Sequence, residues 1–231
     1  NCESVLKKCK AHEIEIALGY PWEEILKRAR DKGAALIILG PHTGEAEQKG
    51  VVRARGSIGS TLQGVITHER CPVMIIQRPV PEDRLNFKNV MVCVDFSDSC
   101  RHALEFAKKL AHLFGSRLFI FHAGTLPAAD EALPSTVPAA AGELGEKLEK
   151  FCGGIPDNIP YETHLAEGRE PCSEILKFAL DKDIQLIAMG SHTKEKGPKW
   201  HVGSAVADVS LRAECPVVVV TDPKALRGMA V

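Results

Sequence analysis

The sequence predicts a parallel α/β fold built from two related units, and two observations support this. Residues 21–43 and 171–193 are copies of one segment at a constant offset of 150, with 13 identities in 23 positions without a gap. Such self-similarity indicates a tandem duplication. In addition, short apolar runs alternate with stretches of helical periodicity. This alternation is typical of right-handed βαβ units, in which helices cover both faces of a parallel sheet.

The second copy, residues 87–222, contains the elements of a complete unit. Its helix at 99–114 carries apolar residues at helical spacing and ends at Gly115, which suits a left-handed C-terminal cap. Residues 123–138 contain three prolines and fit a connection that covers a ligand or one without any role. The predicted strands are 89–94, 118–121, 161–165, 186–189 and 217–220, and the predicted helices are 99–114, 139–151, 171–180 and 204–213.

The first copy, residues 1–78, supplies only the matching second half. By the offset of 150 its front half would begin about 63 residues before Asn1. Because such a cut exposes two unpaired strand edges, we expect chain outside this sequence, or another segment, to fill the gap. The predicted elements are helices at 2–10, 21–31 and 60–67 and strands at 13–18, 35–39 and 73–77.

A proline-containing linker at 79–86 separates the copies, and residues 223–231 form a tail. Because prolines stiffen the linker, the two units should be held close together. Their last strands, 73–77 and 217–220, are the expected contact of this pseudo-dimer.

Composition narrows the function. The 29 basic and 30 acidic residues nearly cancel, and only 5% of residues are aromatic, so we expect no nucleic-acid and no membrane-surface partner. No apolar run reaches membrane-spanning length and no signal-peptide core is present, which favours a soluble, cytoplasmic protein. The eight cysteines form no Cys-x-x-Cys pair, and we expect reduced thiols.

Three clusters follow strands of the second copy: Asp95, residues 190–193, and Gly203 with Ser204. In an open α/β sheet a ligand binds beyond the carboxyl ends of the strands, where the strand order reverses, so these clusters should converge. A glycine after a strand lets a ligand approach the backbone, and a Gly-Ser at a helix start offers N–H groups and a hydroxyl to a phosphate. The alternatives are a tight turn at Gly190, an ordinary N-cap at Ser204 and a helix cap at Asp95.

These residues resemble the universal stress protein family over nearly the whole chain. The resemblance implies two flavodoxin-like units, similar to adenine nucleotide alpha hydrolases, each with a five-stranded parallel sheet of order 3-2-1-4-5. It also implies a role in stress response. The resembling segments are 94–97 (VDFS), 174–176 (EIL), 186–192 (LIAMGSH), 203–204 (GS) and 215–220 (CPVVVV).

The family's nucleotide signature is Gly-x2-Gly-x9-Gly-Ser/Thr, and this chain has Gly190-x2-Thr193-x9-Gly203-Ser204. Thr193 replaces the second glycine, and its Cβ excludes conformations that only glycine adopts, although its N–H and hydroxyl could contact a phosphate. The resemblance implies ATP or another adenine nucleotide, with Mg²⁺, as cofactor. By resemblance, Val94 and Met189 would line the base, Asp95 would accept a hydrogen bond from adenine, Gly190 would pack against ribose, and Gly203, Ser204 and Ala205 would hold phosphates.

The first copy departs further from this signature, and we expect no nucleotide there. Fifteen residues separate Thr43 from Gly59 where the second copy has nine. Glu45 and Glu47 lie near the would-be phosphates, and the counterpart of Asp95 would fall in the absent front half.

Other side chains suggest weaker hypotheses. His42, His192 and His201 match no standard zinc spacing, so no metal site is predicted. Cys93 and Cys100 flank Asp95 and could form a redox pair if the turn brings them together, and reactivity would also require exposure and a lowered pKa. The loop residues Lys194, Lys196, Lys199 and His201 either add positive charge near a phosphate or form a solvated basic loop.

The expected function is therefore that of a tandem universal stress protein whose nucleotide occupancy alters dimer or partner contacts. We expect a homodimer in addition to the intramolecular pseudo-dimer, and an unidentified protein partner. No catalytic residue is predicted, because no nucleophile or general base accompanies the phosphate loop. The alternatives are an interaction protein that has lost nucleotide binding and a slow ATPase.

Overall fold

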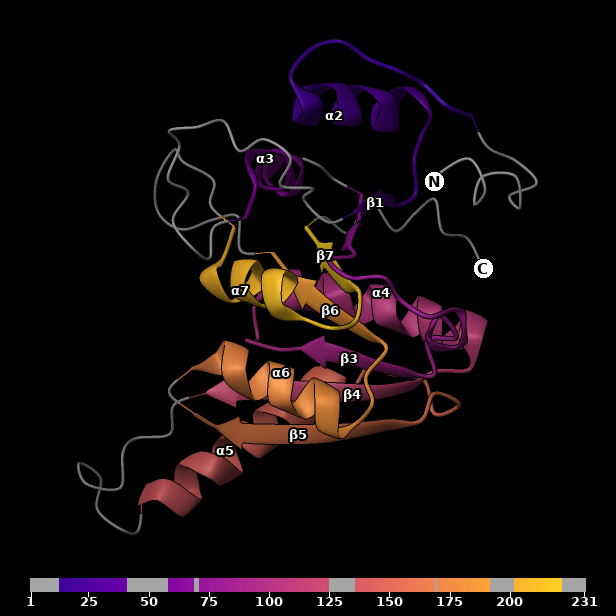
Figure 1. Cartoon of the computed structure of the whole chain (residues 1–231). Coiled ribbons are helices and arrows are strands. Elements are labelled where there is room, and N and C mark those ends of the chain that lie inside the picture. Colours follow the sequence, from indigo (N-terminus) through magenta and orange to yellow (C-terminus); the bar gives the residue numbers. More distant parts are fainter. Residues whose placement is uncertain are drawn as a thin grey trace.

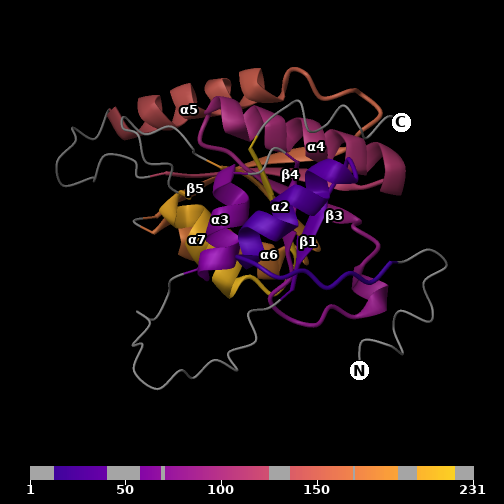
Figure 2. The same ribbon diagram turned by 90° about the horizontal axis from the view of Figure 1, so that it is seen from above.

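One seven-stranded sheet runs through both copies, with helices on its two faces (Figures 1 and 2). The computed structural model describes residues 13–40, 58–68, 71–124, 136–168, 170–191 and 202–221. Along the sheet the strand order is β1-β2-β7-β6-β3-β4-β5. Every pair of neighbours is parallel except β2 and β7.

The second copy forms five parallel strands and four helices close to their predicted positions. Its strands run in the order third, second, first, fourth and fifth across the sheet. None of the described helices is long and apolar enough to cross a membrane. The elements are β3 (Asn89–Cys93), α4 (Asp98–Phe114), β4 (Arg117–Gly124), α5 (Thr136–Cys152), β5 (Tyr161–Glu167), α6 (Pro171–Asp181), β6 (Leu186–Gly190), α7 (Ser204–Arg212) and β7 (Val217–Val220).

The first copy joins this sheet through its last strand. Met74 of β2 lies opposite Val218 of β7 in an antiparallel ladder, so the predicted contact between the last strands is confirmed. The predicted α/β fold is confirmed, and this ladder joins the strands of both copies into one sheet of seven. The first copy supplies α2 (Pro21–Asp31), β1 (Ile37–Leu39), α3 (Ser60–His68) and β2 (Val73–Ile75), and the linker holds the 3₁₀ helix η1 (Glu82–Arg84).

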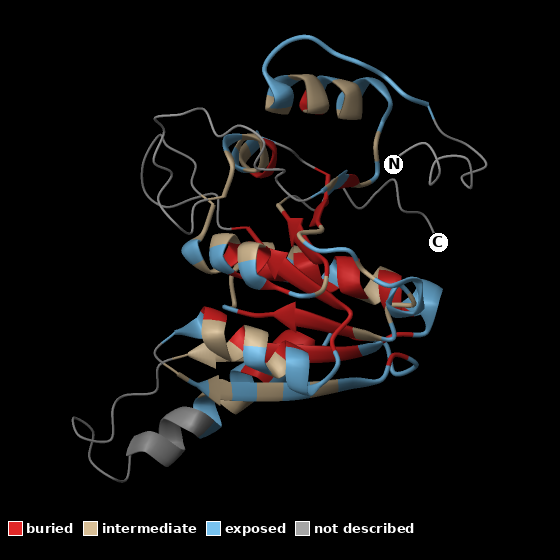
Figure 3. Cartoon of the chain, in the orientation of Figure 1, coloured by how far each residue is buried: buried red, intermediate tan, exposed pale blue. Residues whose placement is uncertain are grey.

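The predicted strand at 13–18 does not form. Ile14, Ile16 and Leu18 are 67%, 91% and 93% exposed, and Figure 3 shows this segment in the colour of exposed residues. Its counterpart β5 is held by β4 alone, and the described part of the first copy contains no counterpart of β4. Without that neighbour the backbone groups have no ladder to join. The predicted helix at 2–10 lies outside the described residues.

Local signals explain where α4 begins and ends. The Ser97 side chain accepts a hydrogen bond from the N–H of Cys100, and Gly115 closes the helix in the left-handed conformation with φ of 66°. The N-cap is Ser97, so the alternative role of Asp95 as a cap for this helix does not apply. The predicted C-terminal cap at Gly115 is confirmed.

Two apolar layers sandwich the sheet. Helices α4 and α5 cover one face, and α2, α3, α6 and α7 cover the other. In β3 the side chains alternate, so that Val92 faces the first layer and Met91 the second. In β1, Ile38 is 58% exposed, whereas its counterpart Ala188 is fully buried in the layer formed with α4. No described helix of the first copy takes the place of α4.

Candidate nucleotide site

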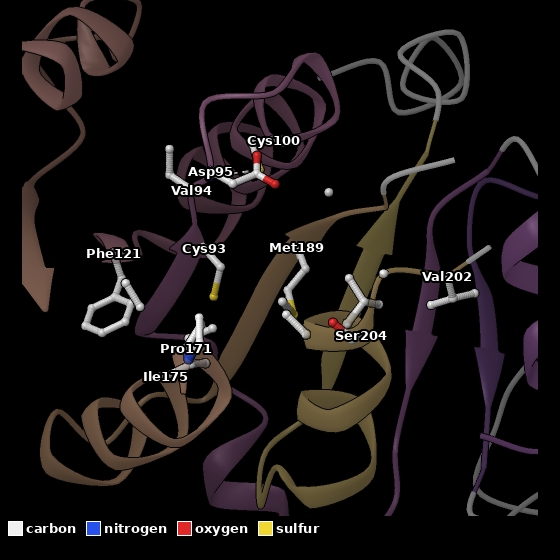
Figure 4. Close-up of a pocket in the computed structure, with 15 residues that line it drawn as sticks. Cys93, Val94, Asp95, Cys100, Phe121, Pro171, Ile175, Met189, Val202 and Ser204 are labelled. Carbon is white, nitrogen blue, oxygen red and sulfur yellow. Dashed lines mark hydrogen bonds between the residues drawn. The ribbon is translucent and has the colours of Figure 1, made fainter. Parts of the chain in front are cut away.

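A pocket of about 570 Å³ opens at the carboxyl ends of β3 and β6 (Figure 4). These neighbours are the first and fourth strands of the second copy, so the strand order reverses between them, as ligand sites in open α/β sheets require. Thr193 and the loop residues Lys194, Lys196, Lys199 and His201 lie outside the described residues. The predicted site residues that line the pocket are Val94, Asp95, Met189, Gly190, Gly203, Ser204 and Ala205.

The pocket also contains residues that sequence reasoning did not assign to it. Phe121 and Ala123 come from the end of β4. This strand is far from β6 in the sequence, but in the sheet only β3 lies between them. Pro171 and Ile175 recur in the first copy as Pro21 and Ile25. Because the repeat was interpreted as evidence for the duplicated fold, neither residue was assigned to a ligand site. The unassigned lining residues are Cys93, Cys100, Phe121, Ala123, Pro171, Ile175, Val202 and Val206.

The Asp95 carboxylate is held by the turn that carries it. Its Oδ1 accepts hydrogen bonds from the Ser97 N–H at 2.9 Å and from the Cys100 thiol at 2.8 Å. The N–H of Asp95 donates in turn to the Cys100 sulfur at 3.4 Å. The following residue, Phe96, adopts the left-handed conformation with φ of 66°. The side chain of Asp95 is thus oriented before any ligand arrives.

The two thiols in the pocket are poor nucleophiles. Burial raises the pKa of Cys93 well above its usual value. Burial first, and the Asp95 carboxylate second, raise the pKa of Cys100 to about 12. Because thiol reactivity requires thiolate and access, the geometry does not favour a redox pair.

Gly190 is required by a close approach between two elements. A Cβ at this position would lie 2.4 Å from the carbonyl carbon of Ser99 and 2.5 Å from the backbone nitrogen of Cys100. The end of β6 therefore touches the first turn of α4. Gly40, its counterpart, has nothing within 4 Å of the same position. Close packing of β6 against α4 therefore requires a glycine at position 190. This reason is separate from the tight turn and the ribose contact considered from the sequence.

The N-terminus of α7 forms part of the pocket wall. No side chain caps this end of the helix. Gly203 is the N-cap, and the first intrahelical bond runs from the Ala207 N–H to the Gly203 carbonyl at 3.0 Å. Ser204 therefore does not act as the N-cap, and its side chain is exposed. Uncapped N–H groups and the positive end of the helix dipole favour an anion at this position.

The described residues include no cluster of three or more His, Cys, Asp or Glu side chains placed to hold a metal ion. The three histidines considered from the sequence, His42, His192 and His201, lie outside the part of the chain that the structure describes.

The first copy has a groove of about 500 Å³ in place of this pocket. Pro21, Ile25 and Ile37 line it. Ile175 and Ile187, the counterparts of Ile25 and Ile37 in the second copy, belong to the layer that also contains Cys93 of β3 and Phe121 of β4. The groove therefore takes the space that these two strands fill in the second copy. The described part of the first copy supplies no counterpart of Asp95.

Comparisons with known proteins agree on one family. Residues 6–77 and 86–221 match the model of the universal stress protein family. Universal stress protein YxiE of Bacillus subtilis is 29% identical over 152 residues, covering 58% of this chain and 99% of that protein. Universal stress protein Rv1996 of Mycobacterium tuberculosis is 24% identical, covering 82% of this chain and 60% of that protein.

Solved structures show the same fold. A universal stress protein from Archaeoglobus fulgidus matches 96% of this chain and 76% of its own, with a TM-score of 0.62 at 23% identity. A putative universal stress protein from Pseudomonas aeruginosa matches 93% of this chain and 72% of its own, with a TM-score of 0.64 at 16% identity.

Proposed function

Because this chain belongs to the universal stress protein family, we propose that the pocket of its second copy binds an adenine nucleotide, ATP or AMP. Family membership places the chain among stress-response proteins. The phosphates would lie at the N-terminus of α7, with Mg²⁺ as counter-ion, and the base would lie beside Asp95.

One observation carries the proposal: a fixed carboxylate and an uncapped helix N-terminus share a single pocket. Figure 4 shows Met189 between Asp95 and Ser204, and Val94 and Met189 supply apolar surface. Adenine has an amino group to donate to a carboxylate and flat apolar faces, and its phosphates are anions suited to a helix N-terminus. A volume of about 570 Å³ is within the usual range for ligand pockets.

We propose binding, and not turnover, as the main activity. The described pocket holds two thiols whose pKa values are raised and one carboxylate already engaged by its own turn. None of these is a poised base or nucleophile. Occupancy could instead alter contacts, because α7 leads directly into β7, which pairs with the first copy. A dimer or partner contact that depends on occupancy is the output we propose.

We place this activity in the cytoplasm. The six cysteines that the structure describes form no disulfide, as expected for a reducing compartment.

The proposal is tested by calorimetric titration with ATP and AMP, with and without Mg²⁺. We expect the wild type to bind, and Asp95→Ala and Ser204→Ala to bind at least about tenfold more weakly, since each loses a hydrogen bond to a polar or charged group. Ser60→Ala is the matched control, because Ser60 begins α3 in the first copy as Ser204 begins α7. This control should bind like the wild type.

Each other outcome has a clear meaning. If the wild type does not bind nucleotide, the proposal is wrong, and an interaction protein that works without nucleotide is favoured. Binding that survives Asp95→Ala unchanged would place the base elsewhere. ATP turnover that disappears in Ser204→Ala would favour a slow ATPase.

A further inference from the structure

Cys100 links the apolar core to the pocket. Its side chain is 3% exposed and packs with Val92, Ala103 and Leu104 between β3 and α4. Its sulfur nevertheless contacts Asp95 twice, as donor to Oδ1 at 2.8 Å and as acceptor from the Asp95 N–H at 3.4 Å. Figure 4 shows the two residues side by side at the rim of the pocket. The core thus holds the carboxylate through a thiol.

In this contact the thiol is the hydrogen-bond donor and the carboxylate is the acceptor. A carboxylate only accepts hydrogen bonds, so the thiol must carry its proton to donate. Burial and the neighbouring carboxylate raise the pKa of Cys100 to about 12, and the proton stays on sulfur at neutral pH. The Ser97 N–H donates to the same oxygen at 2.9 Å. These two donors to Oδ1 come from separate positions of the turn and hold the carboxylate in one orientation.

We infer that Cys100 is a positioning residue that orients Asp95 to recognise the exocyclic amino group of an adenine base. This inference rests on the proposed nucleotide site and adds its specificity determinant. A carboxylate held in one orientation binds more tightly a base that places a donor opposite it. A carboxylate that can rotate and bind water gains less affinity from the same donor. Loss of the thiol should therefore weaken discrimination for the amino group more than it weakens binding in general.

A first experiment needs no nucleotide. Infrared spectroscopy of the ligand-free protein at neutral pH records the S–H stretching bands, and the Cys100 band is identified by its loss in Cys100→Ser. In Asp95→Asn this band should move to higher frequency, because a neutral amide oxygen is a weaker acceptor than a carboxylate. A Cys100 band that does not move would overturn the inference, since the thiol would then not be bonded to Asp95.

A second experiment compares ATP with purine riboside triphosphate, which lacks the amino group. We expect the wild type to prefer ATP and Cys100→Ala to lose most of that preference, about tenfold for one hydrogen bond to a charged group. Cys100→Ser keeps a donor and should recover part of it. Cys152→Ala is the matched control, because Cys152 is also buried in the layer of α4 and α5 but lines no part of the pocket.

The outcomes separate the inference from the proposal beneath it. If the wild type binds neither nucleotide, the proposed function is overturned and this inference with it. If the wild type prefers ATP and Cys100→Ala keeps the full preference, only the inference is overturned. Equal loss of preference in Cys152→Ala would also overturn it, because general loosening of the core would then be the cause.

Discussion

At the scale of single residues, Gly190 and Gly40 occupy equivalent positions in the two copies but differ in what surrounds them. Gly190 is the last residue of β6 and Gly40 directly follows β1, yet only Gly190 meets the backbone of Ser99 and Cys100. The difference arises because α4 has no counterpart among the described residues of the first copy. A methyl group is therefore tolerated at one position and excluded at the other.

We expect Gly190→Ala to lower the free energy of unfolding by about 1–3 kcal/mol, the usual cost of overpacking. Gly40→Ala should change it by less than about 0.5 kcal/mol, as surface substitutions do. Urea denaturation of both variants measures the difference. Equal effects would contradict the close approach of β6 to α4.

The buried thiol of Cys100 also makes stability depend on pH. Burial raises its pKa in the folded protein from the ordinary value of 9.0 to about 12, so the unfolded chain loses this proton first as the pH rises. The stability that the neutral thiol contributes is therefore present below pH 9 and is lost between about pH 9 and 12, by up to about 1.4 kcal/mol per pH unit. Urea unfolding at pH 7.5 and 10.5 should show a smaller loss in Cys100→Ser than in the wild type, and equal losses would refute this.

At the scale of elements, the contact between α2 and α3 in the first copy differs from the equivalent contact between α6 and α7 in the second copy. Between α2 and α3, Trp22 stacks on His68 with ring centroids 4.9 Å apart. In the second copy the counterparts are Cys172 and Arg212, and the guanidinium donates to the sulfur at 3.6 Å. The ring of Trp22 requires Gly64 opposite it, since a Cβ there would lie 2.6 Å from the ring.

Gly64→Ala should therefore destabilise the protein by about 1–3 kcal/mol through overpacking against Trp22. In a Trp22→Ala background the same change should cost less, because the clashing ring is gone. A double-mutant cycle in urea measures this coupling, which should exceed about 0.5 kcal/mol. Additive effects would mean that Gly64 does not contact Trp22.

At the scale of the whole molecule, the two copies share one sheet and both apolar layers. Met74 of the first copy lies in the layer of α4, and Leu26 lies in the layer that contains Val217. Both β2 and β7 already have a neighbour on each side. A second chain that forms a homodimer must therefore use another surface than these last strands.

The shared layers predict that the described fold unfolds as one unit. Met74→Ala removes a buried side chain at the joint and should cost about 2–5 kcal/mol. The urea transition should move equally for far-ultraviolet circular dichroism and for the fluorescence of Trp22, followed in a Trp200→Phe background. Two separate transitions would show that the copies unfold independently.

Much of the fold was predictable because periodicity and repetition are local properties of a sequence. The bounds of α2 and β7 matched the prediction, and Asp95, Gly190 and Ser204, one residue from each predicted cluster, line the same pocket. The segment at 13–18 was predicted as a strand of the second half that the first copy shares with the second copy. A strand also needs a neighbour, however, and no local pattern records whether one is present.

The sequence by itself determined the α/β class, the duplication, the positions of Asp95 and Gly190 at the ends of strands and that of Gly203 at the start of a helix, since each depends on residues close together in the chain. Only the tertiary structure decided that both copies share one sheet, that Phe121 joins the pocket and that Cys100 holds Asp95. Those contacts join segments far apart in sequence or depend on which way a buried side chain points. Strand pairing and core packing, which settle them, are properties of the assembled fold.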